Sequence, residues 1–373
     1  MASKENNVYS RFSFCGKVTV SKKVPFVKRD TYDKGEKISI NFGIKAGNNL
    51  GYVKLEGFKN DEIKTMDTDR NNIEVAWSDR LDEDVIKTVA STKKFTVNLG
   101  ERKEFITEWD IIEYLESALA GYEDDIIVTG KFVLRPGTGK YKDQVYREYQ
   151  IQNVYMPGEK EVPHLTMNLD LYYDKDSMDT TTLKDDGKIM IHCYTPMWSK
   201  ADGAQKMFQI DTVFNTAVFD MDKPKHKAIH DYKMRYLETK SRNPVHMNWQ
   251  IAVVNGAEEV PFTMDSLTEQ QREQVELGIS KMEDFKPRGN ILGDREKELR
   301  LVKPILTGEF EECKTAADSG YTAREFEDEI WTPAVDESVD DMMKGGSKAK
   351  TKAKAAPAVE APADSDDDID TMF

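Results

Sequence analysis

Lysine, arginine and tyrosine side chains recur at alternate positions of short apolar segments in the first half of the chain. In three such segments, one set of alternate residues is largely apolar, and the other set supplies Lys45, Tyr52, Lys54, Lys131 and Arg135. Cationic side chains can follow the phosphates of a single-stranded nucleic acid, and aromatic rings can stack on its unpaired bases at roughly 1–3 kcal/mol per base. The combination predicts a groove for a flexible polyanion with accessible bases.

The predicted interface is larger than these five residues. A loop near residue 22 and a Gly-rich hairpin at 137–144 add cations, and the second half adds two aromatic rings. A solvated lysine or a rim aromatic is about as common as a binding residue at any single position, so the prediction depends on the whole set. The predicted strand-binding residues are Lys17, Lys22, Lys23, Lys45, Tyr52, Lys54, Lys131, Arg135, Lys140, Tyr141, Lys142, Arg147, Tyr194 and Trp198.

Other kinds of site find little support in the sequence. RPGTGKYKD contains Gly-Lys but fails the phosphate-loop pattern, because Leu134 and Tyr141 stand where a glycine and a serine or threonine are required. The three cysteines lie far apart without CxxC spacing, and His192-Cys193 is the only adjacent pair of metal-ligand residues. We therefore expect no catalytic residues, no metal, no cofactor and no enzymatic activity.

Most of the predicted binding residues in the first half of the chain lie on segments with the alternation of β-strands. Two-faced segments at 11–22, 37–46 and 51–59 precede a helix that a capping box at Thr107 begins, and two further strands follow at 125–135 and 145–156. Three strands, one helix and two strands is the order of an OB-fold barrel. Phe12 and Phe14 share a face with Val18 and Val20, which favours the core over base stacking.

A similar order restarts after Pro163. Strands are predicted at 164–174, 188–198 and 245–254, then a helix capped at Ser266 and a closing hairpin at 288–292 and 298–306. The distance from helix cap to first hairpin glycine is 23 residues in both halves, which suggests a repeated topology.

These patterns predict a mainly β fold with a few helices, built from two OB-like antiparallel barrels in tandem. We assign residues 1–160 to the first barrel, 161–312 to the second, with a basic helical insert at about 199–244, and 313–373 to an acidic, disordered, linker-like tail. The segment from Glu309 onward holds 18 of the 68 acidic residues and 7 of the 53 basic ones. The remaining body is nearly neutral and can carry a basic groove if the two signs are segregated.

The tail itself changes composition toward its end. GGSKAKTKAKAAPAVEAPA (345–363) cannot bury enough surface to fold, and DSDDDIDTMF then places two large apolar residues at the acidic end. An OB-like body, a flexible linker and an acidic tip ending in phenylalanine together resemble single-stranded DNA-binding proteins. The tip looks like the tail of the bacterial family, and the long body looks more like the larger replication proteins of tailed bacteriophages.

The resemblance implies a cytoplasmic protein, in the host cell if viral, that coats single-stranded DNA in replication, recombination and repair. It also implies that the tip docks on replication or recombination proteins such as a polymerase, helicase, primase or recombinase. The expected apolar pocket would take the terminal phenylalanine, and the acids would steer it there. The tip residues carried over are Asp366, Asp367, Asp368, Ile369, Asp370, Met372 and Phe373. Asp370-Thr371-Met372 stands where the bacterial family usually has a proline before the phenylalanine.

Two alternatives remain open from the sequence. An RNA-binding or RNA-chaperone protein would have the same fold and a similar groove. A structural or assembly protein of a virion would instead present an apolar strand face in place of Lys54, Lys131 and Arg135. No apolar run is long enough to cross a membrane, so no membrane partner is expected.

Overall fold

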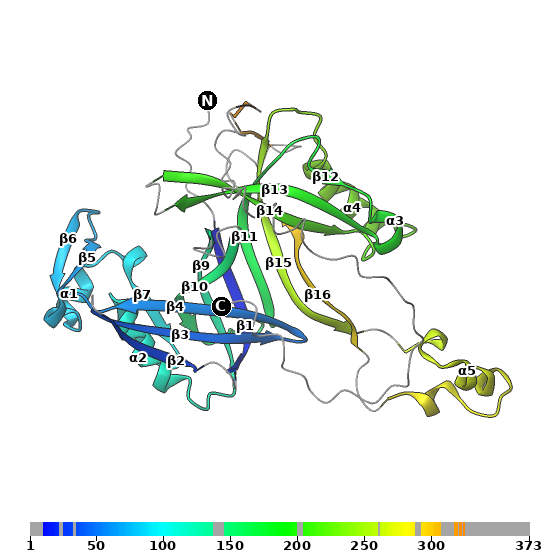
Figure 1. The fold of residues 1–373 in the computed structure, drawn as a ribbon, viewed down its shortest axis with the longest axis horizontal. Coiled ribbons are helices and arrows are strands. Elements are labelled where there is room, and N and C mark those ends of the chain that lie inside the picture. Colours follow the sequence, from blue (N-terminus) through cyan, green and yellow to red (C-terminus); the bar gives the residue numbers. More distant parts are fainter. Residues whose placement is uncertain are drawn as a thin grey trace, which may run out of the picture.

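The structure is a computed structural model, which describes residues 10–21, 25–32, 35–136, 145–199, 204–259, 262–287, 292–306, 317–319, 321–322 and 324. Most of the described elements are strands, with a few helices between them (Figure 1). The predicted fold class, mainly β with a few helices, is confirmed. None of the described helices is long and apolar enough to span a membrane.

Five strands of the N-terminal half pair in a closed circuit. They are β1 (Ser10–Thr19), β3 (Gly35–Ala46), β4 (Asn49–Phe58), β10 (Val145–Tyr155) and β9 (Asp125–Pro136). Each is paired with the next, β4 and β10 in parallel and the others antiparallel, and β9 returns to β1. This circuit, the N-terminal barrel, has the closed pairing that a small OB-like barrel requires.

Alternation along these strands fills the barrel interior. Phe12 and Phe14 of β1 are both buried, as predicted from the face they share. Helix α2 (Glu108–Ala118) packs against β3 and β4 and buries Ile111 and Leu115 in the same core. The Thr107 hydroxyl accepts a hydrogen bond from the Asp110 N–H at 3.1 Å, so the predicted helix start is confirmed.

An insertion separates β4 from α2, and the sequence patterns predicted no element in it. It contains β5 (Glu62–Met66), β6 (Asn72–Ala76), η1 (Trp77–Asp79), α1 (Glu83–Thr88), η2 (Ser91–Lys93), β7 (Phe95–Asn98) and β8 (Arg102–Phe105). Among the described strands, β5 and β6 pair with each other in a separate two-stranded sheet, whereas β7 extends the barrel sheet in parallel with β10. On the opposite edge, β2 (Val27–Tyr32) pairs with β3.

The C-terminal half repeats the circuit. Its strands are β11 (His164–Tyr173), β13 (Lys188–Ser199), β14 (Ala204–Asn215), β16 (Leu292–Pro304) and β15 (Val245–Glu259), with β14 and β16 in parallel. β15 pairs with both β16 and β11, and β11 meets β13 at Tyr172 and Tyr194. We call this circuit the C-terminal barrel. Short elements β12 (Met178–Asp179) and α3 (Leu183–Asp186) connect β11 to β13.

The segment 199–244 is not a helical insert but supplies two elements of the C-terminal barrel. β14 pairs with β13 along its length, and helix α4 (Pro224–Leu237) follows the third strand of its circuit and precedes the fourth, as α2 does in the first circuit. The basic composition of α4 hid its role, because Tyr236 and Leu237 at its end are buried in the core while most of its other residues are polar or charged.

The helix predicted from Ser266 does not hold the place in the chain order that α2 holds in the N-terminal barrel. Helix α5 (Glu269–Glu276) begins after Thr268 and stands between the fourth and fifth strands, flanked by η4 (Met264–Ser266) and η5 (Met282–Phe285). The equal cap-to-glycine spacing therefore does not mark equivalent elements. A capping box determines where a helix starts and not what it packs against. The prediction of a closing hairpin is also wrong. From residue 292 to residue 304 the chain forms the single strand β16, without a turn.

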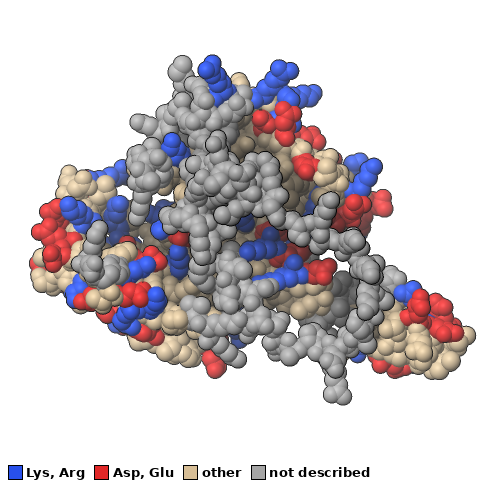
Figure 2. All heavy atoms as spheres, in the orientation of Figure 1, with Lys and Arg blue, Asp and Glu red and all other residues tan. Residues whose placement is uncertain are grey.

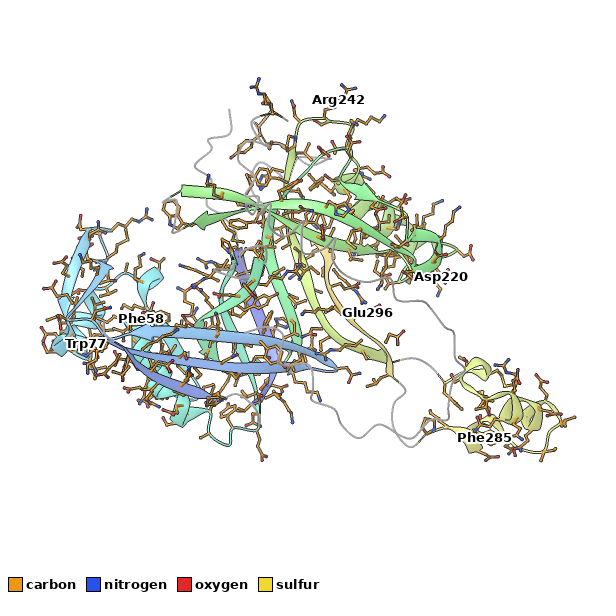
Figure 3. The ribbon with its side chains drawn as sticks, viewed as in Figure 1. Phe58, Trp77, Asp220, Arg242, Phe285 and Glu296 are labelled. Carbon is orange, nitrogen blue, oxygen red and sulfur yellow. The ribbon has the colours of Figure 1, made fainter. Side chains whose placement is uncertain are left out.

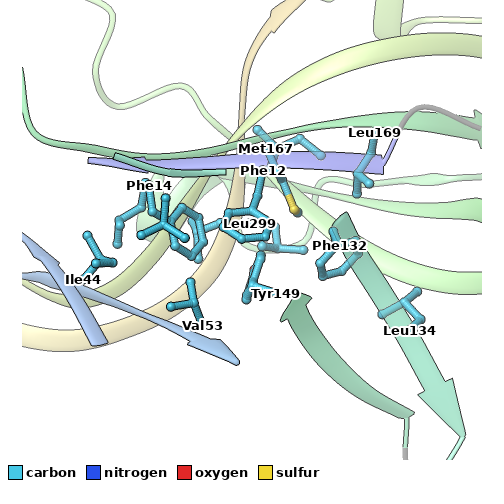
Figure 4. Close-up of a cluster of buried hydrophobic side chains, with 14 of the residues drawn as sticks. Phe12, Phe14, Ile44, Val53, Phe132, Leu134, Tyr149, Met167, Leu169 and Leu299 are labelled. Carbon is cyan, nitrogen blue, oxygen red and sulfur yellow. The ribbon is translucent and has the colours of Figure 1, made fainter. Parts of the chain in front are cut away.

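The two barrels share one sheet and one core. β1 pairs with β11 from Ser10–Leu169 to Cys15–His164, and β4 meets β15 at Asn49 and Gly256. Phe12 and Phe14 lie in the same buried cluster as Met167 and Leu299 of the C-terminal barrel (Figure 4). The barrels therefore form one continuous body, and the boundary placed at residue 160 stays a prediction.

Six residues of the region predicted as tail are described by the structure: 317–319, 321–322 and 324. β17 (Ala317–Asp318) pairs with the start of β15, and the ring of Tyr321 meets that of Tyr172 edge-on at 5.9 Å. Its composition hid this contact because pairing of two residues leaves no periodic pattern. Residues 325–373, with the linker and the predicted docking tip, lie outside the described residues.

Candidate nucleic-acid interface

A row of polar side chains crosses both barrels on their solvent face. Residues directly opposite each other in neighbouring strands point to the same side of the sheet. Following the pairings from β4 through β10, β9, β1, β11 and β15 to β16 gives the polar row: Lys54, Gln150, Lys131, Arg11, Asn168, Gln250 and Lys303. All seven are exposed or half-buried, whereas their strand neighbours Phe12, Phe132 and Ile151 are buried.

The polar row is long enough for several nucleotides. Neighbouring strands are about 4.8 Å apart, so the six steps from Lys54 to Lys303 cover about 29 Å along the curved sheet. It crosses the strands and passes from one barrel to the other through the β1–β11 pairing. A bound strand would therefore contact both barrels at once.

A second polar line runs beside the row. Asn153, Thr129, Ser13 and Thr166 follow one another across β10, β9, β1 and β11. Together with Arg11 and other members of the polar row they line a cavity of about 340 Å³. The Thr129 hydroxyl shares a 2.8 Å hydrogen bond with the Tyr155 hydroxyl and accepts one from the Asn153 amide at 3.2 Å. The cavity wall is thus rich in neutral donors and acceptors.

Three cations gather where the row leaves β9. Lys131 is flanked by Arg11 of β1 and by Lys93 of the insertion, and a further cavity of about 300 Å³ is lined by Lys131, Lys93 and Lys64. Burial, and then the positive charges of Lys93 and Arg11, hold the pKa of Lys131 below its usual range. Like charges held this close favour a bound anion, because a phosphate would relieve their repulsion.

The backbones of β9 and β10 approach each other closely at Gly130, next to Lys131. A Cβ added to Gly130 would lie 1.9 Å from the carbonyl oxygen of Gln150 on the neighbouring strand. At this point β10 changes register between Ile151 and Asn153. Gly130 thus permits the bulge that places both Gln152 and Asn153 on the wall of the polar cavity.

An aromatic pocket lies between the two barrels. Strands β4 and β10 face β15 and β16 across a mostly apolar cavity of about 250 Å³, whose wall includes Tyr52, Tyr146 and Val253 with Lys54 and Arg147. Both tyrosines are half-buried. Of the predicted residues, the structure brings Tyr52, Lys54 and Arg147 together here. Tyr146 was missed, and unlike Tyr52 it lies between two exposed residues, Val145 and Arg147, so alternation does not single it out.

Arg147 reaches this pocket by a different route from the others. It pairs with Leu134 and is in phase with buried Tyr149, so its register is that of the barrel interior. It is exposed because it lies near the start of β10. The alternation rule alone would have placed it inside.

Two predicted phosphate contacts share one carboxylate. The Glu148 carboxylate forms ion pairs with Lys54, whose Nζ lies 2.6 Å from one oxygen, and with Arg135, whose Nε lies 2.9 Å from the other. Nearby, burial raises the pKa of Glu56, but the hydrogen bond from Lys37 and the charges of Lys37, Lys54 and Arg135 outweigh it and hold the pKa low. A phosphate at Lys54 or Arg135 must therefore compete with the ion pairs of Glu148. At Lys131 the opposing carboxylate is that of Glu108, which raises the pKa of the lysine but less than the other causes lower it.

The remaining predicted residues lie away from the row. Lys17 and Lys45 are paired with each other and exposed, about 20 Å along β1 from Arg11 at the usual rise per strand residue. Tyr194 packs with Tyr172 and Met207 in a small cluster on the C-terminal barrel. Trp198 is 64% exposed near the end of β13. Five predicted residues lie outside the described part of the chain: Lys22, Lys23, Lys140, Tyr141 and Lys142.

Surface charge is mixed rather than uniformly basic. Figure 2 shows Lys and Arg side chains on both barrels, interspersed with Asp and Glu. Strand register places Arg11, Lys54 and Lys131, whereas Lys93 comes from η2 in the insertion. The sequence patterns did not predict Arg11, Lys93 or Lys64. Arg11 alternates with buried Phe12 and could have been found, whereas Lys93 lies in the insertion.

The described residues contain no group of three or more His, Cys, Asp or Glu side chains that could hold a metal ion. One arrangement of side chains resembles a catalytic triad. The Ser13 hydroxyl and His164 Nε2 are 3.1 Å apart, and Glu161 lies 3.5 Å from His164 Nδ1. However, Ser13 sits inside β1 between β9 and β11, whose pairings occupy the neighbouring backbone N–H groups. These groups cannot then stabilise an oxyanion as acyl transfer requires.

The buried cysteines are equally unsuited to reaction. Cys15 and Cys193 are free thiols in the core. Burial, followed by the charges of Asp125 and Glu161, raises the pKa of Cys15 to about 11. Burial also raises the pKa of Cys193 to about 12. Neither thiol is a nucleophile at neutral pH.

Comparison with known proteins gives distant structural neighbours. No family model and no curated protein matches the chain. The crystal structure of wild-type single-stranded DNA binding protein from Thermus aquaticus matches with a TM-score of 0.30 and 8% identity, covering 66% of this chain and 87% of that chain. A deletion mutant of that protein has a TM-score of 0.29 and 9% identity with the same coverage. TM-scores this low do not establish a common fold.

Proposed function

We propose that the protein binds single-stranded DNA without sequence preference and coats it. The observation that carries this proposal is the polar row, which continues across both barrels and passes through the cluster of Arg11, Lys93 and Lys131. These three closely spaced cations, whose charge Glu108 offsets only in part, favour a phosphate chain over an uncharged ligand.

Two features favour a single strand over a duplex and argue against base-specific recognition. The aromatic pocket can take only bases that are not paired, and stacking tolerates every base because each has a π-face. Lysine and glutamine side chains in the row are flexible and contact phosphates in many positions. The function proposed is therefore binding and protection, without catalysis.

The wider role is proposed from the composition of the tail. We place the protein in DNA replication, recombination or repair in the cytoplasm, as a protein of tailed-bacteriophage type that recruits partner proteins through its tip. Phe373→Ala keeps every charge, so DNA affinity should stay unchanged while capture of purified replication proteins is lost. Equal capture by the variant and the parent would reduce the tail to a charged brush.

Salt-dependent titration tests the binding proposal. The double variant Arg11→Ala with Lys131→Ala removes two phosphate contacts, so the slope of log affinity against log salt for poly-dT should fall by about 1.4. The control is Lys87→Ala with Lys184→Ala, two exposed lysines off the row, which should keep the slope. An unchanged slope in a folded Arg11/Lys131 variant would contradict the proposal. Matched RNA oligonucleotides, if bound more tightly than DNA, would favour the RNA-binding alternative.

A further inference from the structure

An arm projects from the C-terminal barrel between β15 and β16. It consists of residues 262–287, and in Figure 1 its helix α5 stands apart from both barrels. Among its described side chains only Leu267 is buried. Leu277 and Ile279 are 67% and 70% exposed, and Phe285 also lies on this arm (Figure 3). A short element with so little core of its own gains stability from a surface that covers its apolar residues.

Acidic residues line the arm beside its apolar end. Glu269, Glu273 and Glu276 follow at intervals of four and three residues, which places them on one face of α5. They lead directly to Leu277 and Ile279, and all five residues are exposed. In the part of the chain that the structure describes, none of the three glutamates forms an ion pair. Such a face repels DNA, so the arm is not an extension of the polar row.

Helix α4 presents the opposite pattern. Tyr236 and Leu237 at its C-terminal end are buried in the core, and an exposed stripe leads up to Tyr236 through Lys225, Ile229, Tyr232 and Arg235. Ile229 and Tyr232 are 39% and 37% exposed. The ring of Tyr232 is held edge-on against Tyr236 at 5.3 Å. Neither Lys225 nor Arg235 is paired with a carboxylate of the described residues.

The two surfaces complement each other in charge and apolar content. Each combines two exposed apolar side chains with a set of like charges: the three glutamates on α5, and Lys225 and Arg235 on α4. At the helical rise per residue, Glu269 to Glu276 spans about 10 Å, and Lys225 to Arg235 about 15 Å. Complementary charge of this kind selects the partner and suppresses pairing of like surfaces.

We infer that the acidic arm of one copy docks on the α4 stripe of a second copy of this chain. Because the two surfaces differ, the contact is heterologous and does not close on itself, so it can continue from copy to copy. On a DNA strand it would bring neighbouring proteins together. The inference goes beyond the proposed binding function and can be tested without DNA.

Reciprocal charge reversal tests the contact. One variant carries Glu273→Lys and Glu276→Lys, and the other carries Lys225→Glu and Arg235→Glu. Each variant alone has two surfaces of the same sign, so sedimentation velocity at low salt should show concentration-dependent association in the parent and none in either variant. An equimolar mixture should associate again, because each arm then meets a stripe of opposite sign. Circular dichroism checks that both variants are folded.

Every other pattern overturns the inference. If only the α4 variant loses association, another acidic segment such as the tail occupies α4. If only the arm variant loses it, the arm docks elsewhere. If the mixture fails to associate, or the parent itself remains monomeric, the two surfaces are not partners.

DNA measurements keep this inference separate from the proposed function. On a dT oligonucleotide that holds one protein, the arm variant should bind within twofold of the parent. On long poly-dT its cooperativity should fall at least tenfold. Failure of the parent to bind the short oligonucleotide would instead contradict the function proposed above.

Discussion

The two barrels share one pairing scheme but present different chemistry to solvent. In the polar row, the N-terminal barrel supplies Arg11, Lys54 and Lys131, whereas the C-terminal barrel supplies two amides and Lys303. The loop between the fourth and fifth strands of the C-terminal barrel carries the acidic arm. Interior positions must keep the core packed, whereas outward positions and loops are free to diverge. One barrel is thus suited to phosphate contact, and the other adds a surface for protein contact.

The largest expected effect concerns how independent the barrels are. Gly130→Val would force β9 and β10 apart, because the added Cβ meets the Gln150 carbonyl oxygen at 1.9 Å. We expect a loss of about 3–5 kcal/mol or failure to fold. Gly158→Ala, where a Cβ meets nothing within 4 Å, is the control.

The same variant probes the shared core. Calorimetry and near-UV circular dichroism should show both barrels melting in one transition, because β1 pairs with β11 and their side chains share a cluster. Two separate transitions, with only the first shifted, would make the barrels independent domains.

The division of charge predicts unequal contributions to DNA affinity. Arg11→Ala with Lys131→Ala should weaken poly-dT binding roughly tenfold to a hundredfold near physiological salt, since each phosphate contact adds to the salt-dependent term. Gln250→Ala with Lys303→Ala removes one cation, so its loss should be smaller, with a slope change of about 0.7. Equal losses from the two pairs would show that the barrels contribute alike.

Aromatic residues offer a finer contrast between the barrels. Tyr52→Ala in the aromatic pocket should cost about 1–3 kcal/mol of binding with an unchanged salt slope, because stacking involves no counterion release. Tyr194→Ala should instead lower the thermal midpoint and leave binding nearly unchanged, since Tyr194 packs with Tyr172 and Met207. We expect Trp198→Ala, which removes an exposed ring, to weaken binding in the same way as Tyr52→Ala. Normal binding by both Tyr52→Ala and Trp198→Ala would assign these rings a packing role.

The smallest expected effect is alkaline pH dependence at the cationic cluster. The pKa of Lys131 is lowered in the free protein, so this side chain loses its proton at lower pH than an ordinary lysine. Bound phosphate favours the protonated form, and affinity should therefore fall as pH rises toward about 10, beginning earlier than for other lysines. Lys131→Arg keeps its charge there and should flatten the decline at constant ionic strength. A decline identical in the variant would exclude Lys131 as its source.

The same lowered pKa has a consequence for stability. Between the folded and unfolded pKa values the unfolded chain binds more protons, so the contribution of Lys131 to stability rises with pH across that alkaline window. Affinity and stability should thus change in opposite directions there. This separates loss of a phosphate contact from unfolding.

Much of the local structure could be predicted from the sequence. Alternation in 37–46 and 51–59 identifies strands and their inward faces, and it places Phe12 and Phe14 in the core. The Thr107 cap locates the start of α2. These signals are local, because a strand repeats every two residues and a cap acts within one turn. They are therefore visible without knowing what each element packs against.

The interface was decided by tertiary structure. Arg11 lies beside Lys131 only because β1 and β9 pair in one particular register, and a shift of one residue would turn Arg11 inward. Lys93 comes close to Lys131 from the insertion. Glu148 of β10 forms ion pairs with Lys54 of β4 and Arg135 of β9. Likewise α4, not α5, packs on the C-terminal barrel, because buried Tyr236 and Leu237 outweigh its basic composition. Sequence determines which way each side chain can face, but contacts between distant segments determine which of those side chains meet.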